Sequence, residues 1–144
     1  TRGLEPFKLG KARNMRSGND VTIIAAGILL EKAMQASEIL AAQGIQAAVI
    51  NMHTIKPLDE ATIIEQAKAT GCMVTAEEHS VLGGLGGAVA EVLSEHVPVP
   101  LVRVGTQDTF GESGPPDELL QKYGLTAQDI VEAAKKSIER KKNR

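Results

Sequence analysis

Three consecutive polar residues, Glu77-Glu78-His79, are the first candidates for chemistry in this chain. Two carboxylates and an imidazole can ligate a metal ion or act as an acid–base pair. They follow the apolar run 72–76, which has the character of a buried strand. Because successive side chains of a strand point to opposite faces, three in a row rarely converge on one atom. The pattern favours a smaller role, in which one carboxylate accepts a hydrogen bond from a neighbouring chain or from a loop amide.

A glycine-rich run follows, with Gly83, Gly84, Gly86 and Gly87 between a strand and a helix. A phosphate-binding turn would lie at such a place. The dinucleotide fingerprint fails, because it needs Gly or Ala where the chain has Val89, and no acidic residue closes the next strand. No Walker lysine is present either. We expect these glycines to allow close packing, within the chain or against a partner.

His53 follows a second apolar run, so it is expected at the carboxyl edge of a sheet. A histidine there can donate to a phosphate or to a substrate hydroxyl, and the alternative is a loop histidine that bonds only to backbone. Cys72 begins a buried strand and is expected to be inert. His96 is expected at a helix C-terminus, with no assigned function. No Ser, Thr or Cys lies in a nucleophile-elbow context.

Strands and helices are expected to alternate along the chain. The expected strands cover 21–26, 47–50, 72–76 and 101–104, and the weakly alternating segment 11–16 can pair with the first of them as an edge hairpin. The expected helices cover 28–43, 59–69, about 85–93, 117–123 and 126–138. Gly44 and Gly71 mark helix ends, whereas Asp59 and the pair Thr126 and Asp129 mark helix starts.

This order predicts an α/β fold: a three-layer, doubly wound, mostly parallel sheet of about five strands with one antiparallel edge strand. In such sheets ligands and partners meet the loops that follow the carboxyl ends of the strands. The loops at that edge are 27–30, 51–58, 77–87 and 105–116. The last of them is polar and glycine-rich, and long loops of this kind are often functional.

Composition excludes several classes of protein. The chain has 144 residues and one cysteine, so it is expected to form one domain without disulfides or a cysteine-rich zinc site. It lacks tryptophan, and no apolar run approaches the roughly 20 residues that cross a bilayer. The net charge is −2, with basic residues concentrated near both ends. We expect a cytoplasmic protein with neither nucleic acid nor membrane as a partner.

The motifs together resemble the C-terminal domain of transketolase. The resemblance rests on NMHTIKPLD (51–59), TAEEHSVLGGLG (75–86) and FGESGPPDELLQKYGL (110–125), in this order and spacing. It covers about residues 8–138 and is strongest for transketolases whose N- and C-terminal sections are often separate chains. It divides the chain into a linker from a missing upstream domain (1–10), a transketolase C-terminal-like domain (11–140) and a basic tail (141–144). The first residue, Thr1, is also typical of a processed end or of a piece of a longer protein.

The resemblance implies a function for the assembled enzyme. Transketolases transfer a two-carbon ketol unit between sugar phosphates, and thiamine diphosphate with Mg²⁺ supplies the carbanion chemistry. The family binds this cofactor in other domains, so no cofactor, metal or catalytic residue is expected in this chain. Its role would be to dock on the upstream cofactor-binding domains and to support the homodimer. The interface residues implied are Glu77, Glu78, His79, Gly83, Gly84, Gly86 and Gly87.

Three alternatives stay open at this point. Deoxyxylulose-phosphate synthases and the β subunits of 2-oxo acid dehydrogenases share the domain. The synthases carry an arginine that reaches the substrate phosphate at the place of His53, so His53 is a possible phosphate or interface contact. Histidine is a weaker and pH-dependent anion partner, which favours transketolase over the synthase. The third alternative is a free-standing regulatory or ligand-binding domain with a pocket at loops 51–58 and 105–116.

Overall fold

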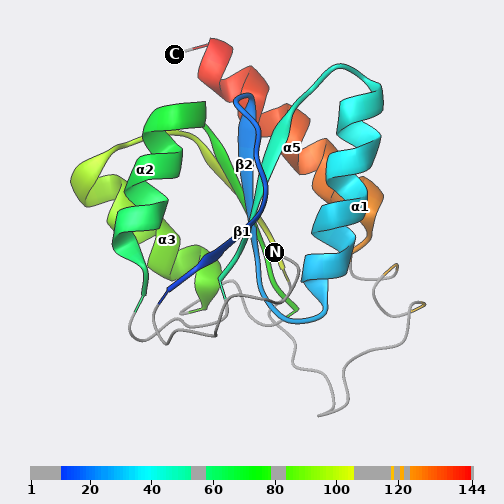
Figure 1. Cartoon of the computed structure of the whole chain (residues 1–144), viewed down its shortest axis with the longest axis horizontal. Helices are drawn as coiled ribbons and strands as arrows, with labels where there is room; N and C mark the ends of the chain where they lie inside the picture. Colours follow the sequence, from blue (N-terminus) through cyan, green and yellow to red (C-terminus); the bar gives the residue numbers. More distant parts are fainter. Residues whose placement is uncertain are drawn as a thin grey trace.

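The protein folds around a five-stranded sheet with the order β1-β3-β2-β4-β5 (Figure 1). The computed structural model describes residues 11–52, 58–78, 84–105, 118, 121 and 124–143. The strands are β1 (Arg13–Arg16), β2 (Val21–Ala25), β3 (Ala47–Asn51), β4 (Met73–Ala76) and β5 (Leu101–Val104). Strands β3, β2, β4 and β5 are parallel, and β1 is antiparallel at the edge. The predicted mostly parallel sheet with one antiparallel edge strand is confirmed.

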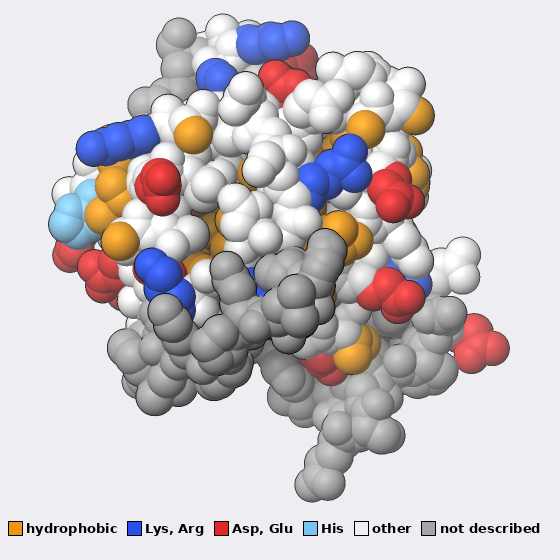
Figure 2. Space-filling view, viewed as in Figure 1, with side chains coloured by type: hydrophobic (Ala, Val, Ile, Leu, Met, Phe, Trp, Pro, Cys, Tyr) orange, Lys and Arg blue, Asp and Glu red, His pale blue; other side chains and the backbone are white. Residues whose placement is uncertain are grey.

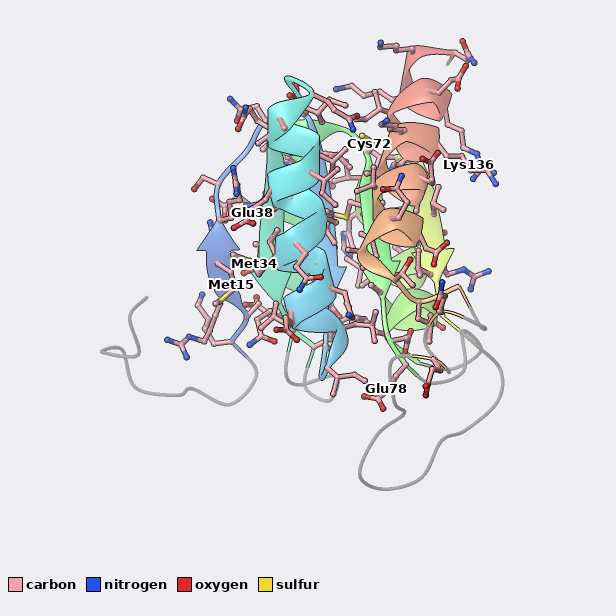
Figure 3. The ribbon with its side chains drawn as sticks, turned by 90° about the vertical axis from the view of Figure 1, so that its right-hand side faces the viewer. Met15, Met34, Glu38, Cys72, Glu78 and Lys136 are labelled. Atoms are coloured by element: carbon pink, nitrogen blue, oxygen red, sulfur yellow. The ribbon has the colours of Figure 1, made fainter. Side chains whose placement is uncertain are left out.

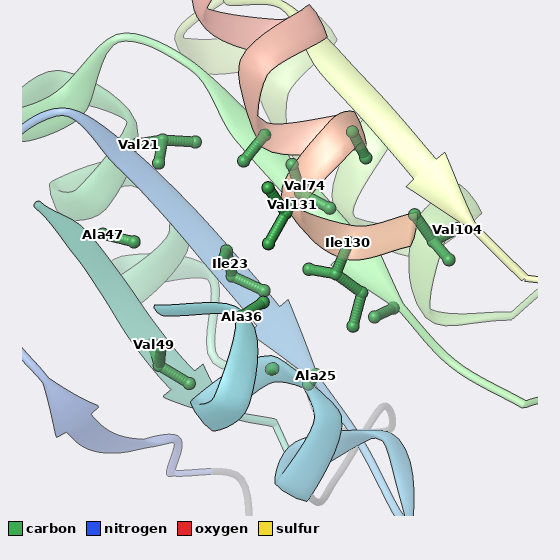
Figure 4. Packing of buried hydrophobic residues seen from close by; sticks show 14 of the residues in the cluster. Val21, Ile23, Ala25, Ala36, Ala47, Val49, Val74, Val104, Ile130 and Val131 are labelled. Atoms are coloured by element: carbon green, nitrogen blue, oxygen red, sulfur yellow. The ribbon is translucent and has the colours of Figure 1, made fainter. Parts of the chain in front are cut away.

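Helices cover both faces of the sheet, as the doubly wound prediction requires (Figure 1). The described helices are α1 (Leu29–Ala42), α2 (Glu60–Thr70), α3 (Leu85–His96) and α5 (Ala127–Lys142). Ile23 of β2 packs in the cluster that includes α1 and α5 (Figure 4). The next residue, Ile24, packs in the cluster that includes α2 and α3. Because both faces are covered, every residue of β2 is buried, which explains its continuous apolar run.

The helix boundaries follow the expected capping residues. The Asp59 side chain accepts a hydrogen bond from the Thr62 N–H at the start of α2, and Gly71 ends that helix at φ 78°. Thr126 and Asp129 form a capping box at the start of α5. The short helix expected over 117–123 lies almost wholly outside the described residues.

Strand β1 differs from the hairpin expectation. It pairs with β3, with Arg13 opposite Asn51, and not with β2. Strand β2 already has a parallel neighbour on each side, so neither of its edges is open to β1. The turn at Gly18 instead crosses the start of β3, where the Asp20 carboxylate accepts a hydrogen bond from the Gln46 N–H at 2.7 Å.

The basic C-terminal segment is partly built into the fold. Lys141 and Lys142 belong to α5, although the sequence suggested a tail over 141–144. The Lys141 ammonium donates to the Thr70 carbonyl at 2.7 Å, at the end of α2. On the face seen in Figure 2, basic and acidic side chains are interspersed. In the described part of the chain, no helix is both long enough and apolar enough to span a bilayer.

Candidate functional site

The carboxyl ends of the four parallel strands meet at one edge of the sheet, which we call the carboxyl edge. In the register, Ala25 lies beside both Asn51 and Ala76, and Ala76 lies beside Val104. The described residues that directly follow these strands therefore lie at one edge, as the sequence predicted. Glu78 lies at this edge, below the start of α1 in Figure 3.

Glu77 is built into the start of α3. Its side chain is buried, with the residue 6% exposed. One carboxylate oxygen accepts from the Leu85 N–H at 2.9 Å and the other from the Gly86 N–H at 2.7 Å. These are the first two amides of α3, which have no partner within the helix. A carboxylate bonded to amides is the arrangement that the sequence favoured, but the amides belong to the same chain, which counts against Glu77 as a direct interface contact.

Glu78 diverges from Glu77. Its Oε1 lies 3.2 Å from the place where a Cβ on Gly27 would stand, at the start of α1, whereas Glu77 binds α3. No hydrogen bond to Glu78 is present within the part of the chain that the structure describes. Among the described residues, no three His, Cys, Asp or Glu side chains are placed to hold a metal ion. His79, the third member of the motif, lies outside those residues.

The glycine run packs closely against the sheet at Gly86. A Cβ on Gly86 would stand 2.7 Å from Arg103 Cδ and 3.0 Å from Thr75 Oγ1. Gly84 is the N-cap of α3 with extended backbone at φ −100°, so its conformation does not require glycine. The expected close packing therefore occurs at Gly86, within the chain. Gly83 lies outside the described residues, and an interface role for Gly84 and Gly87 stays a prediction.

The Thr75 hydroxyl under this contact is buried and has no hydrogen-bond partner among the described residues. It lies on β4, on the same face as Glu77, two residues further along. The space beside it is filled by Gly86. Thr75 therefore contributes to the tight helix–sheet contact and not to an open pocket.

Asp59 does more than cap α2. Its carboxylate also accepts from the Ala12 N–H at 2.8 Å and from the Thr62 hydroxyl at 2.8 Å. Burial raises the pKa of Asp59, but the hydrogen bonds from Ala12 and Thr62 and the charge of Lys11 outweigh it, so the pKa lies below its ordinary value. Asp59 thus fixes the segment that leads into β1 against the start of α2. Sequence reasoning missed this contact because 47 residues separate its ends.

Ile28 is a second residue that sequence reasoning missed. It lies directly before α1 and is 39% exposed, the exposed large hydrophobic residue of the described chain. No side chain caps α1. A signal was available, since Ile28 falls outside the buried stripe of this helix and stands where Ser, Thr, Asp or Asn is favoured.

The other candidates lie elsewhere. His53 is outside the described residues, so its role stays a prediction. His96, at the end of α3, has a side chain that is 46% exposed and lies 4.0 Å from Glu95. Cys72 is fully buried, burial raises the pKa of its thiol, and its sulfur donates to the Asp20 carbonyl at 3.3 Å. A raised pKa leaves the thiol protonated and inert, as expected.

An apolar cavity of about 490 Å³ lies at the opposite end of the sheet. Leu93, Pro98, Val99 and Leu101 line it, with Arg140 at its side. Figure 3 shows that Cys72 and Lys136 mark the end of the domain that is remote from Glu78. The cavity is therefore separate from the carboxyl edge.

The fold and this edge define a doubly wound α/β domain. At its carboxyl edge, the carboxylates of Glu77 and Asp59 accept hydrogen bonds from amides in the first turn of α3 and of α2. The chain matches the family model described as Transketolase, C-terminal domain, over residues 10–130. It therefore belongs to the transketolase C-terminal domain family, as the motifs indicated.

The relatives extend the match. The chain is 55% identical over 137 residues to the 6-deoxy-6-sulfo-D-fructose transketolase subunit SqwH of Clostridium sp. (strain MSTE9), covering 95% of this chain and 42% of the relative. It is 45% identical over 131 residues to a 1-deoxy-D-xylulose-5-phosphate synthase of Trichormus variabilis, covering 90% of this chain and 21% of the relative. A solved structure described as "Split gene transketolase, inactive beta4 tetramer" superposes with a TM-score of 0.88 at 52% identity, covering 94% of this chain and 44% of that chain. The chain thus spans less than half of each of these proteins.

Proposed function

We propose that this chain is the C-terminal part of a transketolase and that it supports assembly of the active enzyme without carrying catalytic groups. The assembled enzyme transfers a two-carbon ketol unit between sugar phosphates in the pentose phosphate pathway of the cytoplasm. Thiamine diphosphate and Mg²⁺ are bound by the upstream domains. The observation that carries the proposal is the 55% identity to a transketolase subunit, of which this chain spans 42%.

The geometry of the carboxyl edge supports an assembly role. Glu77 has the carboxylate chemistry of a general acid or base, but both of its oxygens accept hydrogen bonds from the first amides of α3. Asp59 uses its carboxylate on Ala12 and Thr62. These groups shape the edge, and an edge of fixed shape is suited to docking against another domain.

The proposal assigns the interface residues to this edge. Glu78, Gly84 and Gly87 would face the upstream domains, together with His53, His79 and Gly83, while Glu77 and Gly86 would shape the surface from within. The full enzyme would be a homodimer. The description of the solved relative as an inactive tetramer supports self-association and a lack of activity in the isolated section.

A complementation assay tests the proposal. This chain is mixed with the upstream section of its enzyme, thiamine diphosphate and Mg²⁺, and ketol transfer from xylulose 5-phosphate to ribose 5-phosphate is followed. Each section alone serves as a control. Activity only in the mixture is the expected result. Turnover by this chain alone would show that it carries catalytic groups, and an inactive mixture of sections that demonstrably bind each other would contradict the assignment.

The donor sugar is the second question, because two relatives act on different compounds. A 6-deoxy-6-sulfo-D-fructose donor is favoured by the 55% identity to a subunit with that name. Formation of 1-deoxy-D-xylulose 5-phosphate is the alternative favoured by the 45% identity to a synthase. The same mixture is therefore assayed for all three reactions. The ratios of the three rates identify the preferred reaction, and the same two protein sections are used in every assay.

A further inference from the structure

Ile28 is an exposed apolar residue at the start of α1, where neither burial nor helix capping requires an apolar side chain. The next residue, Leu29, is completely buried, whereas Ile28 is 39% exposed. Helices favour a hydrogen-bonding side chain at their start, and α1 has none there. An exposed isoleucine thus takes the place of a residue that would cap the helix.

The surroundings of Ile28 place it at the centre of the carboxyl edge. It follows β2, the middle strand of the sheet, through Gly27, which has φ 64°. Glu78 Oε1 lies 3.2 Å from the place where a Cβ on Gly27 would stand. Gly27 therefore adjoins both the exposed side chain of Ile28 and a carboxylate that has no hydrogen-bond partner among the described residues.

The described part of the chain begins at the same edge, so an upstream domain would connect there. Strand β1 begins at Arg13, opposite Asn51, the carboxyl end of β3. The preceding residue, Ala12, is held at this edge by its 2.8 Å hydrogen bond to Asp59. A domain joined ahead of residue 11 would therefore connect at the edge that also carries Ile28 and Glu78, and the relatives are more than twice as long as this chain.

We propose that Ile28 is the apolar anchor of the interface with the upstream, cofactor-binding section, and that Glu78 beside it accepts a hydrogen bond from that section. The inference rests on the proposed function and names the residue on which docking depends. An apolar side chain that becomes buried at an interface contributes to its affinity roughly in proportion to the area that it removes from water. Ile28, the exposed isoleucine among the described residues, fits a small apolar pocket, and Glu78 fits a basic or amide group at the rim of that pocket.

The test compares Ile28→Ser with Val99→Ser by isothermal titration of each chain with the separately produced upstream section. Val99 lies at the opposite end of the sheet and packs more deeply in its cluster. In the docked complex the exposed part of the Ile28 side chain would be buried. Because serine buries less apolar area there, Ile28→Ser is expected to raise the Kd about three- to eightfold. Ile28→Asp, which carries a charge into an apolar pocket, raises it further. Val99→Ser leaves the Kd within about twofold, although it lowers the melting temperature more than Ile28→Ser does.

Melting temperatures of the isolated variants separate docking from folding. Ile28→Ser is expected to shift the melting temperature by less than about 2 °C, because the site is exposed and its backbone is already helical. If Ile28→Ser and Ile28→Asp bind the upstream section like the wild-type chain, the inference is wrong. If Kd follows melting temperature across all three variants, it is also wrong. The wild-type mixture reports on the proposed function separately: ketol transfer there with unchanged Ile28→Ser binding would refute only the anchor.

Discussion

Replacing Glu77 by glutamine tests whether this carboxylate serves the fold. The wild-type side chain accepts two hydrogen bonds, at 2.9 and 2.7 Å, from the Leu85 and Gly86 N–H groups. Glutamine has the same shape but offers one acceptor oxygen and one NH₂ group. In Glu77→Gln, one of the two amides would therefore face a donor inside a buried site.

The cost follows from this geometry. A hydrogen bond to a charged group contributes about 1.5–3 kcal/mol, and a negative charge at a helix N-terminus adds about 0.3–1 kcal/mol. Glu77→Gln loses one such bond and the charge, so we expect the free energy of unfolding to fall by about 2–4 kcal/mol. For a chain of 144 residues this corresponds to a drop in melting temperature of about 5–15 °C.

Urea unfolding followed by circular dichroism measures the free energy, and Glu78→Gln is the matched control. The two substitutions remove the same charge from adjacent residues, but only Glu77 has amide partners among the described residues. Glu78→Gln is expected to change the free energy of unfolding by less than about 0.5 kcal/mol. Hydrogen exchange of the Leu85 and Gly86 amides should accelerate in Glu77→Gln alone. Equal stability of the two variants would refute the assignment of Glu77 as the N-terminal anchor of α3.

Three further outcomes are expected. Gly18→Ala should destabilise the fold by more than about 2 kcal/mol in urea unfolding, because its Cβ would stand 2.5 Å from the Ala47 carbonyl carbon. Gly44→Ala, with φ +83° and nothing within 4 Å of its Cβ, should cost only about 1 kcal/mol, and a reversed order would contradict the packing at Gly18. Because the pKa of Asp59 is lowered in the folded state, ionised Asp59 stabilises the fold above the ordinary value of 3.8, and this contribution is lost as pH falls through the folded-state pKa. Urea midpoints should therefore fall more steeply below about pH 4 in the wild type than in Asp59→Asn, and parallel pH profiles would show that the hydrogen bonds do not matter. Thr126→Ala should lower the free energy of unfolding by about 1 kcal/mol through loss of the capping box, and an unchanged melting temperature would argue against that cap.

Local signals in the sequence were sufficient for most of the fold. The cap at Asp59, the left-handed glycine at Gly71 and the capping box at Thr126 are all where the residue types placed them. Each depends on residues within a few positions of one another, so the sequence contains the whole interaction. The apolar run 21–26 likewise predicted a buried strand, and all five residues of β2 are buried.

The features that could not be predicted from the sequence depend on contacts between residues far apart in the chain. Strand β1 pairs with β3 because β2 already has β3 and β4 as its two neighbours. This arrangement follows from the order of all five strands and not from the residues near β1. At the candidate site, the spacing placed Glu77 and the glycines together, but not the direction of the carboxylate. That direction follows from where α3 begins relative to the end of β4, and the first residue of α3, Leu85, comes eight residues after Glu77. The contact between Asp59 and Ala12 and the exposure of Ile28 depend on tertiary packing in the same way.

The Lys141 contact has a practical consequence for experiments on this domain. Its ammonium binds the Thr70 carbonyl at the end of α2, which lies at the amino ends of the parallel strands. Helix α5 has 16 residues, about 24 Å in length, and carries the C-terminal part of the chain to that side. A biotin or an affinity tag attached beyond α5 is thus remote from Ile28 and Glu78. Immobilisation through that tag on a sensor surface would therefore leave the carboxyl edge accessible to a binding partner in solution.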